Sequence, residues 1–190
     1  MKCIFIIEHL EQKLWPWCLV EYKHISKIVG KSNVWFTNIK KSDIKKLKNY
    51  GKVLTESVKE MALDGACVLD PAASKLLTPK DSKQFNYFIF GGILGDNPPK
   101  QRTTPELTQF MKGVEVRNIG HEQFSTDNAV YVVKQITEGK NLHEIPYIDS
   151  PEITINKIES VILPFRYPLV NGKANISKGI VNYLKKNPKM

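Results

Sequence analysis

Two short and almost uninterrupted apolar runs constrain the fold of this chain more than any other feature of its sequence. Gly65–Asp70 reads Gly-Ala-Cys-Val-Leu-Asp, and Asn86–Gly92 reads Asn-Tyr-Phe-Ile-Phe-Gly-Gly. A strand with apolar side chains on both faces is typical of a parallel sheet that helices cover on both sides. Met1–Glu8, Val34–Phe36 and Val114–Val116 are shorter candidates for the same sheet. We therefore expect a mainly parallel sheet at the centre of the fold.

Amphipathic segments alternate with these runs, as the helices of such a fold would. An apolar side chain recurs every three or four residues from Leu14 to Val29, with Pro16 near the start and Gly30 just past the end. Thr126–Glu138 has a comparable pattern and is followed by Gly139, a residue typical of helix ends. Both segments are predicted to be helices.

The remaining segments are less regular. Short helices are expected after Ser42-Asp43, where lysines dominate, and over Thr55–Met61. From Asn141 onward, short β-like runs alternate with prolines, and neither an internal repeat nor a linker interrupts the chain. The alternation of strands and helices predicts an α/β fold with a mainly parallel sheet flanked by helices. A chain of 190 residues is about the right length for one such domain, over residues 1–190.

The net charge of +9 is unevenly distributed along the chain. Ten lysines between Lys23 and Lys59 face only three acidic residues as far as Glu60, and six basic residues but no acidic one follow Glu159. The intervening segment is slightly acidic. The two basic regions are candidates for contact with an anionic surface such as ribosomal RNA. The alternative is that these lysines only solvate exposed helix faces.

Cysteine usage and hydropathy indicate the compartment. Cys3, Cys18 and Cys67 form no spaced cluster and are odd in number, which argues against a disulfide framework and against a zinc site. The apolar run Cys3–Ile7 is too short for a signal peptide or a membrane span. We expect a cytoplasmic protein with no bound metal and no association with a membrane.

Special residues follow the candidate strands where ligands of parallel sheets bind, at the carboxyl ends. The loop after Asn86–Gly92 carries Gly91, Gly92 and Gly95, which let backbone amides approach a ligand closely. No Lys-Ser/Thr pair follows the glycines, and their spacing differs from the dinucleotide fingerprint. The loop is therefore either a ligand loop of another kind or a tight turn.

A second candidate loop, Ile119–Asp127, runs directly into the predicted helix at Thr126. Free amides at a helix N-terminus can hold a carboxylate, such as the methionine end of a cofactor. Ser125, Thr126 or Asp127 is expected to cap the same helix, and capping does not exclude ligand binding.

Candidate catalytic side chains are fewer. The four histidines show no metal-binding spacing, and no serine or cysteine nucleophile stands in a recognisable elbow. Carboxylates at strand ends are better candidates: Glu8 ends the first strand, Asp70 a middle one, and Asp96 lies inside the glycine-rich loop.

Several segments, taken in order along the chain, resemble the motifs of one known family. They are Ile7–Glu11, Cys67–Pro71, Phe88–Pro99 followed by Arg102-Thr103, Gln123–Asp127 and Pro164–Tyr167. They resemble a SPOUT-class group of S-adenosylmethionine (SAM)-dependent methyltransferases that is often labelled as predicted RNA methyltransferases. The characterised fungal member of this group methylates an arginine of a small-subunit ribosomal protein. The match spans nearly the whole chain, and Phe90–Asp96 is its most specific part.

The resemblance implies a trefoil knot formed by roughly residues 85–170, an exception to the rule that chains do not thread. It also implies that SAM lies in the knot and is held largely by backbone groups. Carried over to this chain, the cofactor-binding residues are Phe90, Gly91, Gly92, Leu94, Gly95, Ile119, Gly120, Gln123, Thr126, Asp127, Pro164 and Phe165. SPOUT enzymes usually dimerise through the knot whereas the characterised relative acts alone, so a monomer and a knot-mediated dimer both stay open.

The leading functional hypothesis is an arginine methyltransferase with a small-subunit ribosomal protein as its substrate. A guanidinium must be oriented and must lose a proton as the carbon–nitrogen bond forms, and a carboxylate can do both. Asp96 and Glu8 are the candidate bases, with His9 as a weaker alternative. An RNA methyltransferase is the first rival, favoured by the basic regions. An inactive ribosome- or RNA-binding module is the second.

Overall fold

The computed structural model describes residues 3–187 and is built on one six-stranded sheet. Its strands are β1 (Ile4–His9), β2 (Val34–Thr37), β3 (Lys52–Val53), β4 (Ala66–Leu69), β5 (Tyr87–Gly92) and β6 (Glu115–Arg117). They lie in the order β3-β2-β1-β5-β4-β6, and every neighbouring pair is parallel. The parallel sheet expected from the apolar runs is confirmed. Of its six strands, the short edge strand β3 was not predicted.

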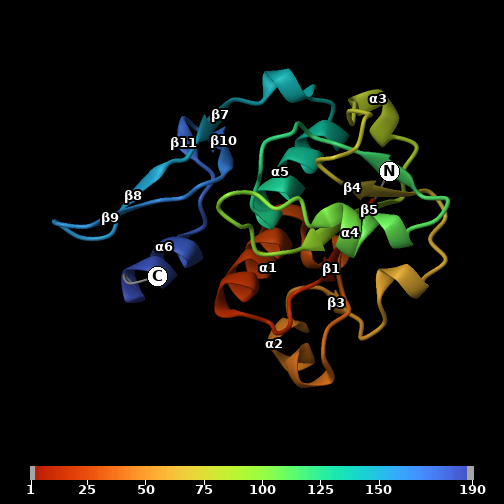
Figure 1. Ribbon diagram of the computed structural model, residues 1–190, viewed down its shortest axis with the longest axis horizontal. Helices are drawn as coiled ribbons and strands as arrows, with labels where there is room; N and C mark the ends of the chain where they lie inside the picture. The colour runs from red at the N-terminus through yellow and green to blue at the C-terminus, as the bar shows by residue number, and fades with distance from the viewer. Residues whose placement is uncertain (1–2, 188–190) are drawn as a thin grey trace.

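Helices cover one face of this sheet. The two long helices, α1 (Pro16–Val29) and α5 (Thr126–Thr137), pack on each other and on the sheet (Figure 1). Pro16 occupies the first turn of α1, while Gly30, with a φ of 83°, ends it. The predicted boundaries of both helices are confirmed, because apolar periodicity and terminal residues agree in each.

Shorter elements cover the opposite face and fill the connections. They are η3 (Val58–Glu60), α4 (Thr103–Glu106), η4 (Thr108–Phe110), η1 (Lys31–Asn33), η2 (Lys41–Asp43), α2 (Ile44–Leu47), α3 (Pro79–Ser82) and η5 (Leu142–Glu144). The lysine-rich helix expected after Ser42-Asp43 is therefore only the short α2. Ile6, Val68 and Ile89 on this face pack against Val58 and Leu107 in a second apolar cluster.

The helix predicted over Thr55–Met61 is wrong. Thr55 and Glu56 form a bend beside the edge of the sheet, where the backbone oxygens of Leu54 and Glu56 accept hydrogen bonds from the amides of Ile39 and Asn38 at 3.0 and 2.9 Å. Only the single turn η3 forms, and Ser57 caps it. Pairing with the sheet edge has overridden the local helix preference.

The C-terminal part of the chain, from Tyr147 onward, forms an arm of different construction (Figure 1). A small antiparallel sheet contains β7 (Tyr147–Asp149), β10 (Arg166–Val170) and β11 (Lys173–Ala174), and a hairpin contains β8 (Glu152–Thr154) and β9 (Ser160–Ile162). The hairpin projects from the body, and α6 (Lys178–Lys186) packs against α1. The short β-runs between prolines are confirmed, whereas α6 was not predicted.

Some expectations concern residues at the two ends of the chain. Met1 and Lys2 of the first predicted strand, and Lys189 of the basic C-terminal region, lie outside the described residues. Within residues 3–187, no helix combines the length and the apolar character that crossing a bilayer requires. Burial raises the pKa of the Cys18 and Cys67 thiols to about 12.

The topology determines where a site can lie. The chain places β2 and β3 on one side of β1, and β5, β4 and β6 on the other. Ligands of open parallel sheets bind beyond the carboxyl ends of the strands, next to such a change of direction. The loops that follow β1, β4, β5 and β6 all meet at that edge.

Candidate active site

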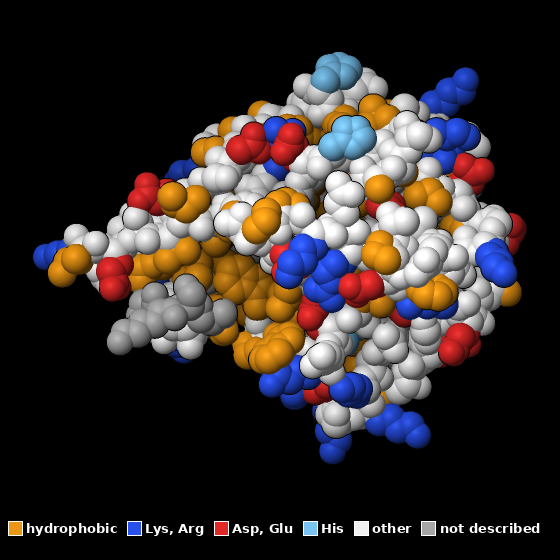
Figure 2. Space-filling model, viewed as in Figure 1, with side chains coloured by type: hydrophobic (Ala, Val, Ile, Leu, Met, Phe, Trp, Pro, Cys, Tyr) orange, Lys and Arg blue, Asp and Glu red, His pale blue; other side chains and the backbone are white. Residues whose placement is uncertain are grey.

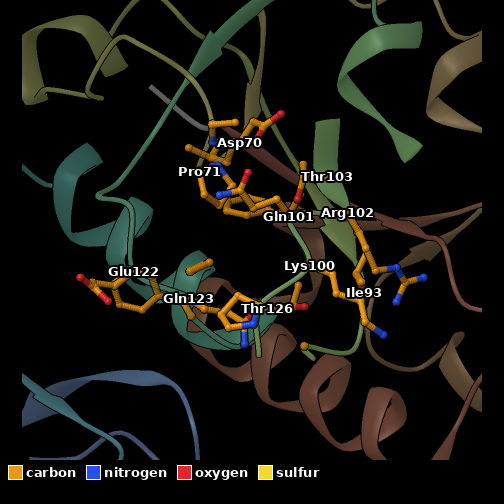
Figure 3. Close-up of a pocket in the computed structure, with 18 of the residues that line it drawn as sticks. Asp70, Pro71, Ile93, Lys100, Gln101, Arg102, Thr103, Glu122, Gln123 and Thr126 are labelled. Atoms are coloured by element: carbon orange, nitrogen blue, oxygen red, sulfur yellow. Dashed lines mark hydrogen bonds between the residues drawn. The ribbon is translucent and has the colours of Figure 1, made fainter. Parts of the chain in front are cut away.

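A cavity of about 250 Å³ lies at the carboxyl edge of the sheet (Figure 3). Its walls come from the end of β5 at Gly91 and from three loops, which follow β4 at Asp70, β5 at Ile93 and β6 at Ile119. Segments separated by about fifty residues in sequence thus meet because parallel strands all end at one edge of the sheet. The cavity lies where the sequence predicted a ligand site.

Most of the predicted cofactor-binding residues line this cavity. They are Phe90, Gly91, Leu94, Gly95, Ile119, Gly120, Gln123 and Thr126. The Gln123 side-chain amide donates to the backbone oxygen of Asp96 at 3.1 Å, which joins the β5 and β6 loops directly. The two loops proposed from the sequence are therefore parts of one site.

Gly92 does not line the cavity, although its neighbour Gly91 does. Successive residues of a strand point to opposite faces, so Gly92 faces α1. A Cβ atom there would overlap the Tyr22 hydroxyl and lie 3.0 Å from the backbone oxygen of Glu8. The absent side chain makes room for Tyr22, whose ring stacks on Phe36 at 5.1 Å.

Glu8 and His9, two of the three expected catalytic residues, also lie outside the cavity lining. The Glu8 carboxylate is fully buried and accepts hydrogen bonds from Thr37 Oγ1 at 2.5 Å, Ser57 Oγ at 2.6 Å and the Val58 amide at 3.0 Å. It holds the η3 turn against the sheet.

His9 is buried on the other face of the sheet. Its Nδ1 lies 2.9 Å from the Tyr22 hydroxyl, and its Nε2 has no hydrogen-bond partner among the described residues. Burial lowers the pKa of His9, which favours the neutral ring.

Asp127 points away from the cavity and towards α1. Its Oδ2 lies 2.6 Å from His24 Nδ1, and its Oδ1 accepts hydrogen bonds from the Ser125 hydroxyl at 2.7 Å and the Asn128 amide at 2.9 Å. Consecutive helical residues point about 100° apart, so Thr126 can face the cavity while Asp127 does not.

Two of the first amides of α5, those of Thr126 and Asn128, have partners within the protein. Ser125 occupies the cap position, but its side chain accepts no backbone amide of the helix, and the Asn128 amide donates to Asp127 Oδ1 instead. Glu21 of α1 accepts from Thr126, and from Trp17 Nε1 at 2.7 Å. Burial and the charge of Asp127 raise the pKa of Glu21 well above its usual value. Two carboxyl groups of the chain thus hold this helix end, which we had expected to bind a cofactor carboxylate.

Pro164 and Phe165 of the arm lie behind the cavity wall. Neither lines the cavity, but a Cβ atom on Gly95 would overlap the Phe165 ring. The Arg166 amide next to it donates to the Gln123 oxygen at 2.8 Å. The arm therefore supports the β5 and β6 loops from outside.

Asp96 is the expected catalytic residue that does line the cavity. Its side chain is 28% exposed, and Oδ1 pairs with Lys100 Nζ at 2.9 Å. Lys100 itself is 66% exposed, so this ion pair lies at the mouth of the cavity rather than inside the core.

Two charged residues of the site, Glu11 and Arg102, were not predicted as functional residues. Arg102 lines the cavity and pairs with Glu11 at 2.9 Å and with Glu106 at 2.6 Å. Their only signal was a place inside the family motifs. Asp70, another strand-end carboxylate, accepts from Thr104 and Thr108 at 2.7 and 2.6 Å and so fastens α4 over the cavity. Among residues 3–187, no three His, Cys, Asp or Glu side chains converge as metal ligands.

Comparison with known proteins gives a consistent result. The family described as protein arginine N-methyltransferase SFM1-like matches residues 4–190. Protein arginine N-methyltransferase SFM1 of Saccharomyces cerevisiae is 35% identical over 201 residues, which cover 96% of this chain and 94% of the yeast protein.

Solved structures agree with this relationship. The crystal structure of the yeast arginine methyltransferase SFM1 complexed with SAM superimposes with a TM-score of 0.88 and 34% identity, covering 98% of this chain and 92% of that one. A Trm10 structure from Thermococcus kodakaraensis reaches a TM-score of 0.62 at 20% identity, over 75% of this chain and 96% of that one, and shares the fold. The SPOUT family expected from the motifs is confirmed. The chain belongs to the SFM1-like family of protein arginine N-methyltransferases.

Proposed function

We propose that this chain transfers a methyl group from SAM to an arginine side chain of a small-subunit ribosomal protein. The observation that carries the proposal is the meeting of the β4, β5 and β6 loops around one cavity, in a chain of this family. The yeast relative, with 35% identity, is named as a protein arginine N-methyltransferase.

The residues of the cavity fit SAM by their chemistry. Gly91, Gly95 and Gly120 expose backbone groups, while Phe90 and Ile119 offer apolar contact to an adenosine. A cavity that is mostly apolar and contains a few polar groups is typical of cofactor sites. When bound, SAM supplies an activated methyl group on its sulfonium. Gln123 contributes by holding the β5 loop at Asp96.

Asp96 is the residue that we propose as the proton acceptor. A substrate guanidinium is protonated at neutral pH and must lose a proton as its nitrogen is methylated. Lys100 Nζ, at 2.9 Å from the Asp96 carboxylate, marks a position that a substrate guanidinium would take over, because both are cations. Glu8 and His9 are enclosed by the core and have no such access.

Substitution Asp96→Asn tests this role. General-base catalysis contributes roughly 10²–10⁴-fold, so turnover should fall by about 100-fold or more while the dissociation constant for SAM changes little. Lys100→Gln is the matched control, because it removes the partner and leaves the base in place. Unchanged turnover in Asp96→Asn would remove Asp96 from the mechanism.

The acceptor can be identified with methyl-labelled SAM. Incubation with ribosomes that lack the modification, followed by separation of protein from RNA, should place the label in one small-subunit protein. Label in RNA would replace the proposal by the rival RNA methyltransferase, and an absence of SAM binding would indicate the inactive module.

We further propose that the basic regions contact ribosomal RNA during this reaction. Lysine and arginine side chains gather at the lower edge of the view in Figure 2, where α2 lies in Figure 1. Lys45→Glu with Lys46→Glu should weaken binding to ribosomes and reduce its salt dependence. Methylation of the isolated protein substrate should stay unchanged. An equal loss on both substrates would contradict RNA contact.

We also propose that residues 1–190 form one domain and that roughly residues 85–170 form a knot. We propose that the methylation takes place in the cytoplasm. A single domain predicts one cooperative unfolding transition and no stable fragment in limited proteolysis. Light scattering distinguishes the monomer from a knot-mediated dimer.

A further inference from the structure

One carboxylate oxygen joins the two ends of the loop that forms a wall of the cavity. Glu11 Oε1 accepts the backbone amide of Leu94 at 3.0 Å and Arg102 Nη1 at 2.9 Å. The residues between Leu94 and Arg102 include Gly95, Asp96 and Lys100, which all line the cavity. We propose that Glu11 is a positioning residue that closes this loop, residues 94–102, into the shape that SAM and the substrate require. The inference rests on the function proposed above.

Glu11 is well placed for this task because β1 and β5 leave the sheet side by side. Their backbones remain joined past the strand ends, where the Leu10 amide donates to the Gly92 oxygen at 3.2 Å. The Glu11 side chain is 13% exposed. Its bonds are therefore partly shielded from water, unlike those of an ordinary surface ion pair, which contributes little.

The far end of the loop has a second anchor. Arg102 donates to both Glu106 oxygens, from Nε at 2.6 Å and from Nη2 at 3.2 Å, and its guanidinium points outwards from the cavity in Figure 3. Glu106 belongs to α4, which Asp70 fastens through Thr104. Glu11 is hydrogen-bonded to both the Leu94 amide and Arg102, so it transmits the fixed position of α4 to the start of the loop.

Glu11 and Glu106 therefore have different effects on the loop. Both carboxylates pair with Arg102, but only Glu11 also accepts an amide at the start of the loop. Loss of Glu106 should loosen the loop near Arg102 only. Loss of Glu11 should loosen both ends, and Asp96 with them. A loop that is held in its binding conformation spares the ligand the cost of ordering it.

Hydrogen exchange of the backbone amides measures this effect without any ligand. In Glu11→Ala, residues 94–102 should exchange faster by about 10-fold, the change that removal of 1.4 kcal/mol produces. Strands β1 and β5 should keep their protection. Glu106→Gln, the matched control, should raise exchange only near Arg102. Glu11→Gln keeps an acceptor oxygen without the charge and should lie between wild type and Glu11→Ala.

Kinetics supply the second readout. Glu11→Ala should raise the KM for SAM by about 10-fold and lower kcat less, and Glu11→Gln should restore part of the loss. Wild-type exchange in the loop of Glu11→Ala would overturn the inference whatever happens to activity. If Glu11→Ala does not fold, Glu11→Gln is the deciding variant. The hydrogen-exchange rate of its Leu94 amide must rise above that of wild type, and an unchanged rate refutes the positioning role of Glu11. If wild-type protein binds no SAM but the loop loosens as described, the proposed function fails while the role of Glu11 in shaping the loop stands.

Discussion

The body of the molecule, residues 4–137, and the C-terminal arm, residues 147–186, bury their apolar side chains to very different extents. Ile6, Val68 and Phe88 of the central sheet are completely enclosed. In the hairpin of the arm, by contrast, Ile158 is 95% exposed and Ile162 is 63% exposed. The body has helices or loops on both faces of its sheet, whereas the arm, α6 included, has one apolar cluster that packs against α1 (Figures 1 and 2).

This difference indicates that the body and the arm contribute to different properties of the protein. The body determines the stability of the fold, since burial of apolar surface is the dominant favourable term. The arm supports the cavity wall where Phe165 packs behind Gly95, the Arg166 amide bonds to the Gln123 oxygen and the Tyr147 ring packs on Phe124. We therefore expect substitutions in the body to change stability, and substitutions at this contact to change cofactor binding.

The largest expected effect comes from a pair of truncations in the two regions. Phe88→Ala in the body should lower the free energy of unfolding by about 3–5 kcal/mol, because it leaves a cavity in the core. Ile162→Ala in the arm should change it by less than about 0.5 kcal/mol. Urea denaturation of both variants checks the contrast, and comparable losses would contradict it.

Two glycines that are three positions apart, Gly92 and Gly95, sharpen the comparison. Gly92→Ala would force a methyl group against Tyr22 and Glu8 in the body, and should cost about 1–3 kcal/mol of stability. Gly95→Ala would displace the Phe165 ring at the contact with the arm. Its thermal stability should stay near that of wild type, but SAM should bind about 10-fold more weakly. Calorimetric titration and thermal unfolding of both variants separate these outcomes. Similar effects of the two substitutions on stability would contradict the different roles of the body and the arm.

The smallest effect is a pH dependence at the junction of α1 and α5. Burial and the charge of Asp127 raise the pKa of Glu21 in the folded protein, so the folded state retains a proton that the unfolded chain releases above about pH 4.3. The stability contributed by Glu21 is thus complete below that pH and is lost as the pH rises through the folded pKa. Glu21→Gln can still accept from Trp17 and avoids this loss.

Glu21→Gln should accordingly melt at least about 2 °C above wild type at pH 8, and the gap should close towards pH 4. Thermal unfolding of both proteins across this range measures the gap. A gap that does not vary with pH would show that Glu21 is ionised in the folded state.

Much of the fold could be predicted because local patterns and tertiary burial agree in the body. The runs at Ala66–Leu69 and Tyr87–Gly92 are apolar on both faces, as buried parallel strands must be. The helix predicted over Thr55–Met61 is wrong because this segment bonds to residues that are distant in sequence, the Asn38 amide and the Glu8 carboxylate. Helix α6 was not predicted, although its sequence contains a signal. Ser177 is a typical cap residue, and its hydroxyl accepts a hydrogen bond from the Ile180 amide at 3.2 Å. Ile180 and Leu184, which lie four residues apart, share the buried face.

The site could be predicted as loops but not as individual side chains. The glycine-rich loop and the loop before α5 do line one cavity. The direction of each side chain could not be predicted, since Gly92 and Asp127 each adjoin a lining residue but face α1. The pairing of Glu11 with Arg102 spans 91 residues, and no local pattern indicates it.

The most direct test of the account is a crystal structure of this protein with S-adenosylhomocysteine. The ligand should lie in the cavity at the carboxyl edge of the sheet, with Gly91, Gly95 and Gly120 against it and Asp96 facing the sulfur. A ligand bound elsewhere on the molecule, or an empty cavity in crystals soaked at saturating concentration, would contradict the account.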